Sequence, residues 1–251
     1  MNLTDIHTHI LPGVDDGASA PEEALKMLRD CARRDTDTVL LTPHFSWQER
    51  ESKSISFLRQ RTEALRQAAA AAGIGVDLVT GAEVFVTPEL EDLLQEGSVP
   101  TINGTKAVLA EFDFDIDGGE MCEALDMLRS YGLTPVIAHA ERYRAVQQHP
   151  ALALTWNRSG CGVQVNADSL FGGFGRTAQR TAHCLLEYNL VQFVASDCHD
   201  TDDRMPGLRE AYRYLADSTS EGYAQILMQI NPKELLQNGG FLIINPRDPE
   251  R

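Results

Sequence analysis

Residues 5–17 read DIHTHILPGVDDG and close the first apolar segment of the 251-residue chain. In an extended strand, residues i and i+2 point the same way, so His7 and His9 present two imidazoles to one point. Asp15 and Asp16 follow on a loop in which Gly17 eases the turn. Four metal-capable groups after one strand indicate a site at its carboxyl end, where the active sites of parallel β/α barrels are built.

The rest of the chain alternates between short apolar runs and amphipathic helical stretches. The runs predict strands at Leu3–Ile6, Thr38–Leu41, Val76–Val79, Ala107–Phe112, Pro135–Ala138, Gly162–Val165 and Val191–Ala195. Ser19 and Glu22 predict a capping box on the first helix, and Gly73 and Gly132 predict the ends of two others. Seven such units favour an α/β fold with a parallel barrel or a doubly wound sheet. A Rossmann sheet is disfavoured because no glycine-rich fingerprint follows the first strand.

The composition of the chain argues against a nucleic-acid binder, a membrane-spanning protein and a disulfide-rich secreted protein. The chain has 37 acidic and 22 basic residues, a formal charge of −15, and no run that would form the basic face of a nucleic-acid binder. No stretch approaches the roughly 20 apolar residues of a membrane span, and the polar start lacks the layout of a secretion signal. Five cysteines without a C-x-x-C pair argue against a disulfide framework. We expect a soluble, cytoplasmic protein with no nucleic-acid partner and no transmembrane segment; its oligomeric state stays open.

Metal-capable side chains follow almost every predicted strand. In chain order they are His7 and His9, His44, Glu83, Glu111, His139, and Asp197 with His199. In a barrel these strand ends converge on one face. One of Asp15 and Asp16 can reach in from the first loop, which gives nine candidate ligands and suits three ions with about three protein ligands each. The other two histidines, His149 and His183, are assigned to helix surface.

The donor set indicates both the metal and the substrate. Imidazole and carboxylate without thiolate suit Mn, Fe or Zn. Three divalent ions bring about six positive charges against four carboxylates, which leaves a positive pocket suited to a phosphate monoester. Such ions can lower the pKa of a bridging water, so that hydroxide serves as the nucleophile. Arg142 and Arg204 lie shortly after strand-end ligands and suit phosphate oxygens through forked hydrogen bonds.

These segments resemble the polymerase-and-histidinol-phosphatase (PHP) superfamily, and within it the manganese-dependent protein-tyrosine phosphatases of bacterial capsule and exopolysaccharide operons. The motifs that carry the resemblance are DIHTHILPGVDDG, TPHF, GAEV, LAEF, VIAHAERY, FVASDCHDTDDR and INPKELL, which span almost the whole chain. The resemblance implies a single domain over residues 1–251, folded as a distorted (β/α)7 TIM-like barrel. The implied substrate is the phosphotyrosine tail of an autophosphorylating kinase that controls capsule or exopolysaccharide synthesis.

The resemblance also implies a role for each site residue. The implied ligands are His7, His9, Glu83 and Asp197 for one ion, Glu83, Glu111 and His139 for a second, and Asp16, His44 and His199 for a third. Asp16 is thereby selected over Asp15, and Arg142 and Arg204 are assigned to the substrate phosphate. Mn²⁺ is the implied metal, with Fe, Zn, Co and Mg as alternatives.

One residue departs from the pattern, and one spacing is misleading. Relatives often carry a second histidine where this chain has Phe45, so Phe45 and Trp47 either flank an aromatic substrate or pack within their loop.

Cys198 and Arg204 have the C-x5-R spacing of cysteine-based phosphatases, but the acids between them would repel phosphate, so we expect Cys198 to be a core residue.

Three other functions compete with a tyrosine phosphatase. A histidinol phosphatase or other small phosphomonoester hydrolase would use the same pocket. An amidohydrolase or a nuclease-like phosphoesterase would use a related barrel, but the fourth strand ends in Glu111 rather than a bridging lysine. A non-catalytic metal-binding regulator is the third alternative.

Overall fold

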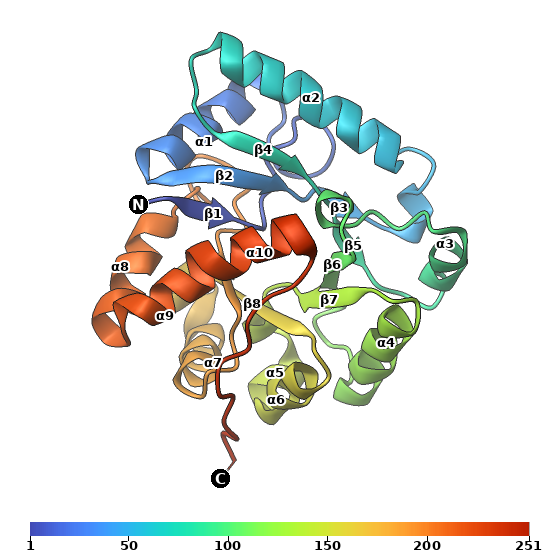
Figure 1. Cartoon of the computed structure of the whole chain (residues 1–251), viewed down its shortest axis with the longest axis vertical. Helices are drawn as coiled ribbons and strands as arrows, with labels where there is room; N and C mark the ends of the chain where they lie inside the picture. The colour runs from blue at the N-terminus through green and yellow to red at the C-terminus, as the bar shows by residue number, and fades with distance from the viewer. Residues whose placement is uncertain (251) are drawn as a thin grey trace.

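A curled sheet of parallel strands forms the centre of the computed structural model, which describes residues 1–250 (Figure 1). Its strands are β1 (Leu3–Asp5), β2 (Thr36–Leu41), β3 (His44–Phe45), β4 (Asp77–Thr80), β5 (Glu83–Phe85), β6 (Ala107–Glu111), β7 (Thr134–Ile137), β8 (Gly162–Asn166) and β9 (Phe193–Ala195). Hydrogen bonding joins them in the orders β1-β2-β4 and β3-β5-β6-β7-β8-β9, and each pairing is parallel. All carboxyl ends therefore point the same way.

Helices surround this sheet on its outer side, and the last helix crosses over its centre (Figure 1). The α-helices are α1 (Pro21–Arg33), α2 (Ile55–Ala71), α3 (Leu90–Glu96), α4 (Gly118–Ser130), α5 (Arg144–Gln148), α6 (Ala151–Arg158), α7 (Gly175–Glu187), α8 (Leu208–Ser218), α9 (Glu221–Gln225) and α10 (Asn231–Asn238). Short 3-10 turns are η1 (Trp47–Glu49), η2 (Ile102–Gly104), η3 (Ala140–Arg142) and η4 (Ala167–Phe171), and η5 (Ile226–Ile230) is a π-helical turn between α9 and α10.

Two apolar clusters lie on the two sides of the sheet. The larger fills the space between the strands and the surrounding helices. The smaller lies inside the curl and combines strand residues such as Ile6 and Leu109 with Leu235 and Leu236 of α10. Asn231 of α10 bonds the carbonyl of Gln192, just before β9 begins, so this helix lies at the amino ends of the strands. The carboxyl ends are left for the polar residues of the site.

The predicted strand positions are confirmed, with one difference in detail. The second and third predicted strands each continue past a break, as β2 and β3 and as β4 and β5. Backbone bonds also connect the first strand to the last: the amide of Asp197 donates to His7 and that of His9 to Cys198, both at 2.9 Å. These bonds follow from the curl of the sheet, which brings the loop after β9 beside the end of β1.

Helix ends follow the sequence signals in part. Gly73 and Gly132 follow α2 and α4 with φ of +67° and +79°, a conformation that glycine adopts at no steric cost. The predicted capping box is wrong: α1 begins after Ala20, and the amide and hydroxyl of Ser19 donate to Glu23 rather than Glu22.

Among residues 1–250, no helix has both the length and the apolar character needed to cross a membrane.

Candidate metal centre

His7 and His9 leave β1 with their rings on the same side of the chain. Both side chains are buried, and their Nε2 atoms lie 3.2 Å apart. Thr8 points the other way, where its hydroxyl donates to the carbonyl of Leu40 at 2.8 Å. The alternation of an extended backbone therefore turns both imidazoles toward one point.

Glu83, the first residue of β5, is the central carboxylate of the cluster. Its Oε2 lies 3.1 Å from His7 Nε2, 3.3 Å from His9 Nε2 and 3.1 Å from His44 Nδ1. Within residues 1–250 this buried oxygen nevertheless has no hydrogen-bond partner. A buried carboxylate oxygen with no hydrogen-bond partner, faced by three imidazole nitrogens, is what a cation site requires, so these residues fit a bound metal ion.

Asp197 faces the cluster with one oxygen and the solvent side with the other. Its Oδ1 lies 3.4 Å from both His7 Nε2 and His9 Nε2. Its Oδ2 lies 2.6 Å from Arg204 Nη2 and 3.5 Å from Arg142 Nη1. The two guanidinium groups are partly exposed, so they lie between the cluster and solvent.

The remaining predicted ligands lie around this centre. Glu111 contacts His44 at 3.3 Å and His139 at 3.6 Å. Asp16, on the exposed rim, lies 3.4 Å from His44 and 3.5 Å from His199. Ligand atoms come within 4.8 Å of one another in three sets: His9, Asp16, His44 and His199; His7, His9 and Asp197; and His44, Glu83 and Glu111. The structure thus brings all nine predicted side chains together.

Attraction to the imidazoles favours the ionised form of the buried acids Glu83 and Asp197. Burial alone would raise the pKa of Glu83, but His7 and the hydrogen bond from His139 hold that pKa well below its usual range. Burial likewise opposes ionisation of Asp197, yet His7 and His9 keep its pKa well below normal. Conversely, burial lowers the pKa of His44, but the nearby carboxylates of Glu111 and Glu83 raise it to about 10. The ionised carboxylates of Glu83 and Asp197 supply negative charge that suits the binding of divalent cations.

Asp15 supports the cluster from behind. Its Oδ2 accepts from His9 Nδ1 at 2.7 Å and from the amide of His44 at 3.0 Å. The first bond fixes the His9 ring so that Nε2 faces Glu83 and Asp197, which is the usual task of a carboxylate behind a ligating histidine. Asp15 and Asp16 therefore occupy different positions, one behind His9 and the other on the rim.

Gln164 and Asn166 on β8 also hold cluster residues in place through their side-chain amides. The sequence did not identify either as a supporting residue. Gln164 Oε1 lies 3.1 Å from His7 Nδ1 and accepts from the amide of His139 at 2.8 Å. Its Nε2 donates to Asn166, whose own Nδ2 donates to Asp197 at 2.8 Å. Their sequence signal is that Gln164 and Asn166 are polar and two positions apart in an otherwise apolar strand, so both side chains point to the same face.

Other residues named from the sequence lie apart from the cluster. Cys198 is fully buried, and burial raises the pKa of its thiol well above normal, so it is a core residue and not a thiolate nucleophile. Phe45 is also in the core, which supports loop packing rather than substrate contact. His149 ends α5 at the surface, and His183 on α7 stacks on Tyr214.

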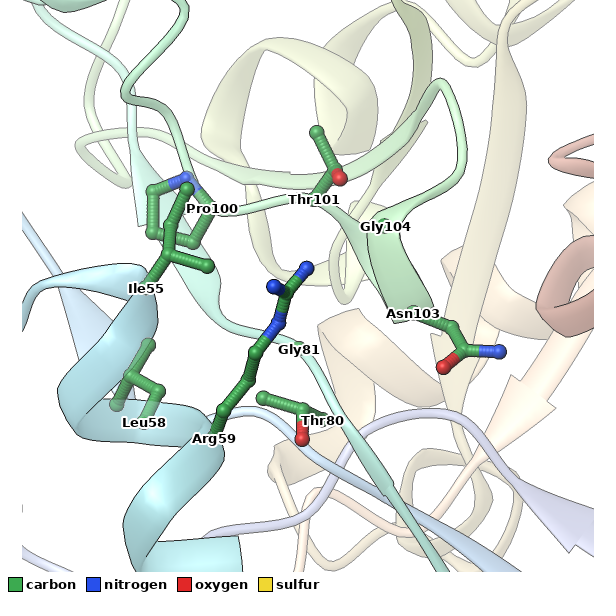
Figure 2. A pocket seen from close by; sticks show the side chains of 9 residues that line it. All are labelled: Ile55, Leu58, Arg59, Thr80, Gly81, Pro100, Thr101, Asn103 and Gly104. Carbon is green, nitrogen blue, oxygen red and sulfur yellow. The ribbon is translucent and has the colours of Figure 1, made fainter.

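A separate hollow of about 270 Å³ lies between α2, the turn after β4 and η2 (Figure 2). Arg59 extends into it from α2, toward Thr101 and Gly104. Its other lining residues are Ile55, Leu58, Thr80, Gly81, Pro100 and Asn103. None of the nine clustered side chains lines this hollow, so we place the chemistry at the strand ends.

Comparison with known proteins agrees with this geometry. The sequence profile of a family described as "Capsular polysaccharide synthesis, CpsB/CapC" matches residues 3–237. Tyrosine-protein phosphatase CpsB of Streptococcus agalactiae serotype V is 30% identical over 247 residues, which cover 94% of this chain and 99% of the relative. Tyrosine-protein phosphatase YwqE of Bacillus subtilis is 30% identical over 236 residues, covering 94% and 92%.

Solved structures extend the comparison to the fold. A structure from work on YwqE of Bacillus subtilis and CpsB of Streptococcus pneumoniae, described as unique metal-dependent tyrosine phosphatases, matches with a TM-score of 0.90. It is 29% identical, and the match covers 98% of this chain and 99% of that one. The lactonase Lmo2620 of Listeria monocytogenes, at 14% identity and a TM-score of 0.61 over 92% of this chain and 93% of the other, shares the fold alone.

Proposed function

The chain belongs to the CpsB/CapC family of capsular polysaccharide synthesis proteins, and on that premise we propose that it is a metal-dependent protein-tyrosine phosphatase. Relatives named tyrosine-protein phosphatase, about 30% identical over nearly the full chain, support this activity. The observation that carries the proposal is the convergence of five imidazoles and four carboxylates beside two arginines. No single one of these side chains would distinguish a phosphatase from another hydrolase.

We assign the ligands to three ions. The proposed sets are His7, His9, Glu83 and Asp197; Glu83, Glu111 and His139; and Asp16, His44 and His199. The mixed imidazole and carboxylate donors support Mn²⁺, with Fe, Zn, Co and Mg as alternatives. Glu83 would contribute to two of the sets, because its Oε1 lies 2.9 Å from His139 and its Oε2 lies 3.1 Å from His7.

The chain's own residues bind and orient the substrate. Arg142 and Arg204 would donate forked hydrogen bonds to the phosphate oxygens, because both guanidinium groups already converge on Asp197 at the mouth of the cluster. Divalent ions bound to the ligands would polarise the phosphoryl group and lower the pKa of water, so that hydroxide forms at neutral pH. Asp15 and Gln164 keep the imidazoles of His9 and His7 in place, so little reorganisation is needed during reaction.

The same proposal includes the type of barrel, the location of the protein in the cell and the protein substrate. We infer that residues 1–250 form one domain, a distorted (β/α)7 barrel, supported by seven strand units and the backbone bonds between the ends of the first and last strands; Arg251 lies outside the described residues. A cytoplasmic location agrees with five free cysteines. The proposed substrate is the phosphotyrosine tail of a kinase that controls capsule synthesis, in keeping with the family's description.

A substrate comparison tests the function. Purified protein is assayed on a phosphotyrosyl peptide, histidinol phosphate and single-stranded DNA, with metal content measured on the same sample. We expect about three transition-metal ions per chain, preference for the peptide, and loss of turnover in chelator that Mn²⁺ restores. Full turnover after exhaustive chelation, or a preference for histidinol phosphate, would refute the proposal.

A further inference from the structure

Two phenylalanines hold the arginines at the mouth of the metal centre. Phe114 lies on the loop after β6, and Phe174 lies just before α7. The Arg142 Cζ atom lies 4.5 Å from the centroid of each ring, so its guanidinium is held between two aromatic faces. Arg204 Cζ lies 5.7 Å from Phe174. Contacts of this kind orient a guanidinium plane as well as attract its charge.

Phe114 is an exposed aromatic residue beside a proposed ligand. Phe114 is 39% exposed as a residue, whereas Phe112 is buried. The Phe114 ring lies 5.5 Å from the ring of His139 and 5.7 Å from that of Tyr143. One exposed aromatic residue means little by itself. Here, however, the exposed ring contacts both a histidine of the metal cluster and the arginine proposed to bind phosphate.

We propose that Phe114 is a specificity-determining residue that selects aryl phosphates by stacking on the ring of the substrate, and that Phe174 positions the two arginines. The inference rests on the proposed phosphatase function. In an aryl phosphate a single oxygen separates the ring from phosphorus, so the ring must lie next to the phosphate subsite. Phe114 already contacts two residues of that subsite, His139 and Arg142.

The expected size of the effect follows from the strength of aromatic pairs. One such pair changes affinity by about twofold to tenfold beyond the area that it buries. Phe114→Leu keeps apolar bulk but removes the ring face, so it should reduce selectivity for aryl over alkyl ligands by that factor. Phe174→Leu should weaken aryl and alkyl ligands alike, because this ring contacts the arginines of the phosphate subsite.

The test compares binding and turnover in the metal-loaded protein. Calorimetry gives the affinity ratio of phenylphosphonate to methylphosphonate, and kinetics give kcat/KM for phosphotyrosyl and phosphoseryl peptides of one sequence. Phe171→Leu is the matched control, because Phe171 is 51% exposed but packs on Tyr214 of α8. We expect both ratios to fall about twofold to tenfold in Phe114→Leu and to stay at the wild-type value in the control.

The outcomes separate this inference from the function on which it rests. Peptide turnover with an unchanged phenyl-to-methyl ratio in Phe114→Leu would overturn the inference alone. Equal losses for aryl and alkyl ligands in that variant would also overturn it, because Phe114 would then only position Arg142. A wild-type protein that holds metal and prefers phenylphosphonate but turns over no phosphotyrosyl peptide would overturn the proposed function, while leaving the aromatic subsite in place.

Discussion

Gly17 is packed directly against the backbone of His9, and replacing it with alanine should displace the loop that carries Asp15 and Asp16. A Cβ at Gly17 would lie 1.9 Å from the His9 carbonyl oxygen and 2.6 Å from its Cβ. Ordinary van der Waals contact begins near 3.4 Å, so the first separation must grow by 1.5 Å (3.4 − 1.9). The constraint is steric, because only the absent side chain permits this approach.

That displacement acts on the metal centre through two residues. The bond from His9 Nδ1 to Asp15, now 2.7 Å, cannot survive a shift of this size. Asp16, which lies 3.4 Å from His44, moves with the same loop. Misplacement by about 1 Å can cost on the order of 100-fold in rate, so kcat/KM for a phosphotyrosyl peptide should fall at least ~100-fold in Gly17→Ala. Overpacking should also destabilise the fold by about 1–3 kcal/mol.

Three measurements on Gly17→Ala check the reasoning: peptide turnover, metal content and thermal unfolding. Metal content should fall by about one ion per chain, because the site proposed for Asp16, His44 and His199 is the one disturbed. Gly75→Ala is the matched control, since a Cβ there meets no atom within 4 Å. Wild-type turnover and metal content in folded Gly17→Ala would show that the loop tolerates the shift and would refute the argument.

Three further predictions concern the same centre. Asp15→Asn removes the negative charge and turns an NH2 group either toward both His9 and His44 or toward the amide of Gly17, so it should weaken metal binding about 10- to 100-fold, as measured by metal titration; unchanged affinity would contradict the supporting role. Cys198→Ser should keep most turnover, whereas Asp197→Ala should abolish it, and an inactive serine variant with full metal content would restore the cysteine mechanism. Chelation should lower the thermal midpoint, since metal at 100 times its Kd stabilises by about 2.7 kcal/mol; an unchanged midpoint would argue against tight binding to the folded state.

The sequence predicted those features that local periodicity controls. Parallel strands put their carboxyl ends on one edge, so positions after seven apolar runs were enough to foresee the cluster that contains His7 and Glu83. Features that depend on how the loops fold were not predictable in this way. Glu23 replaces Glu22 at the first helix because the chain enters that helix one residue later than the pattern implies. Phe114 contacts Arg142 only because two loops meet, and Gln164 supports His7 only across the curl of the sheet.

The loop after β9 shows that the C-x5-R spacing of Cys198 and Arg204 does not by itself indicate a cysteine-based phosphatase, because the fold decides where the two side chains lie. A phosphate-binding cysteine loop needs free backbone amides and an exposed thiolate. Here the Oδ1 atom of Asp200 accepts from the amides of Asp202, Asp203 and Arg204 at 2.7, 2.7 and 3.1 Å, so these donors are directed at the chain's own carboxylate. The turn that results returns Arg204 to Asp197 and leaves Cys198 in the core. The same C-x5-R spacing therefore places its arginine at a carboxylate of the metal cluster, where the substrate's phosphate would meet it.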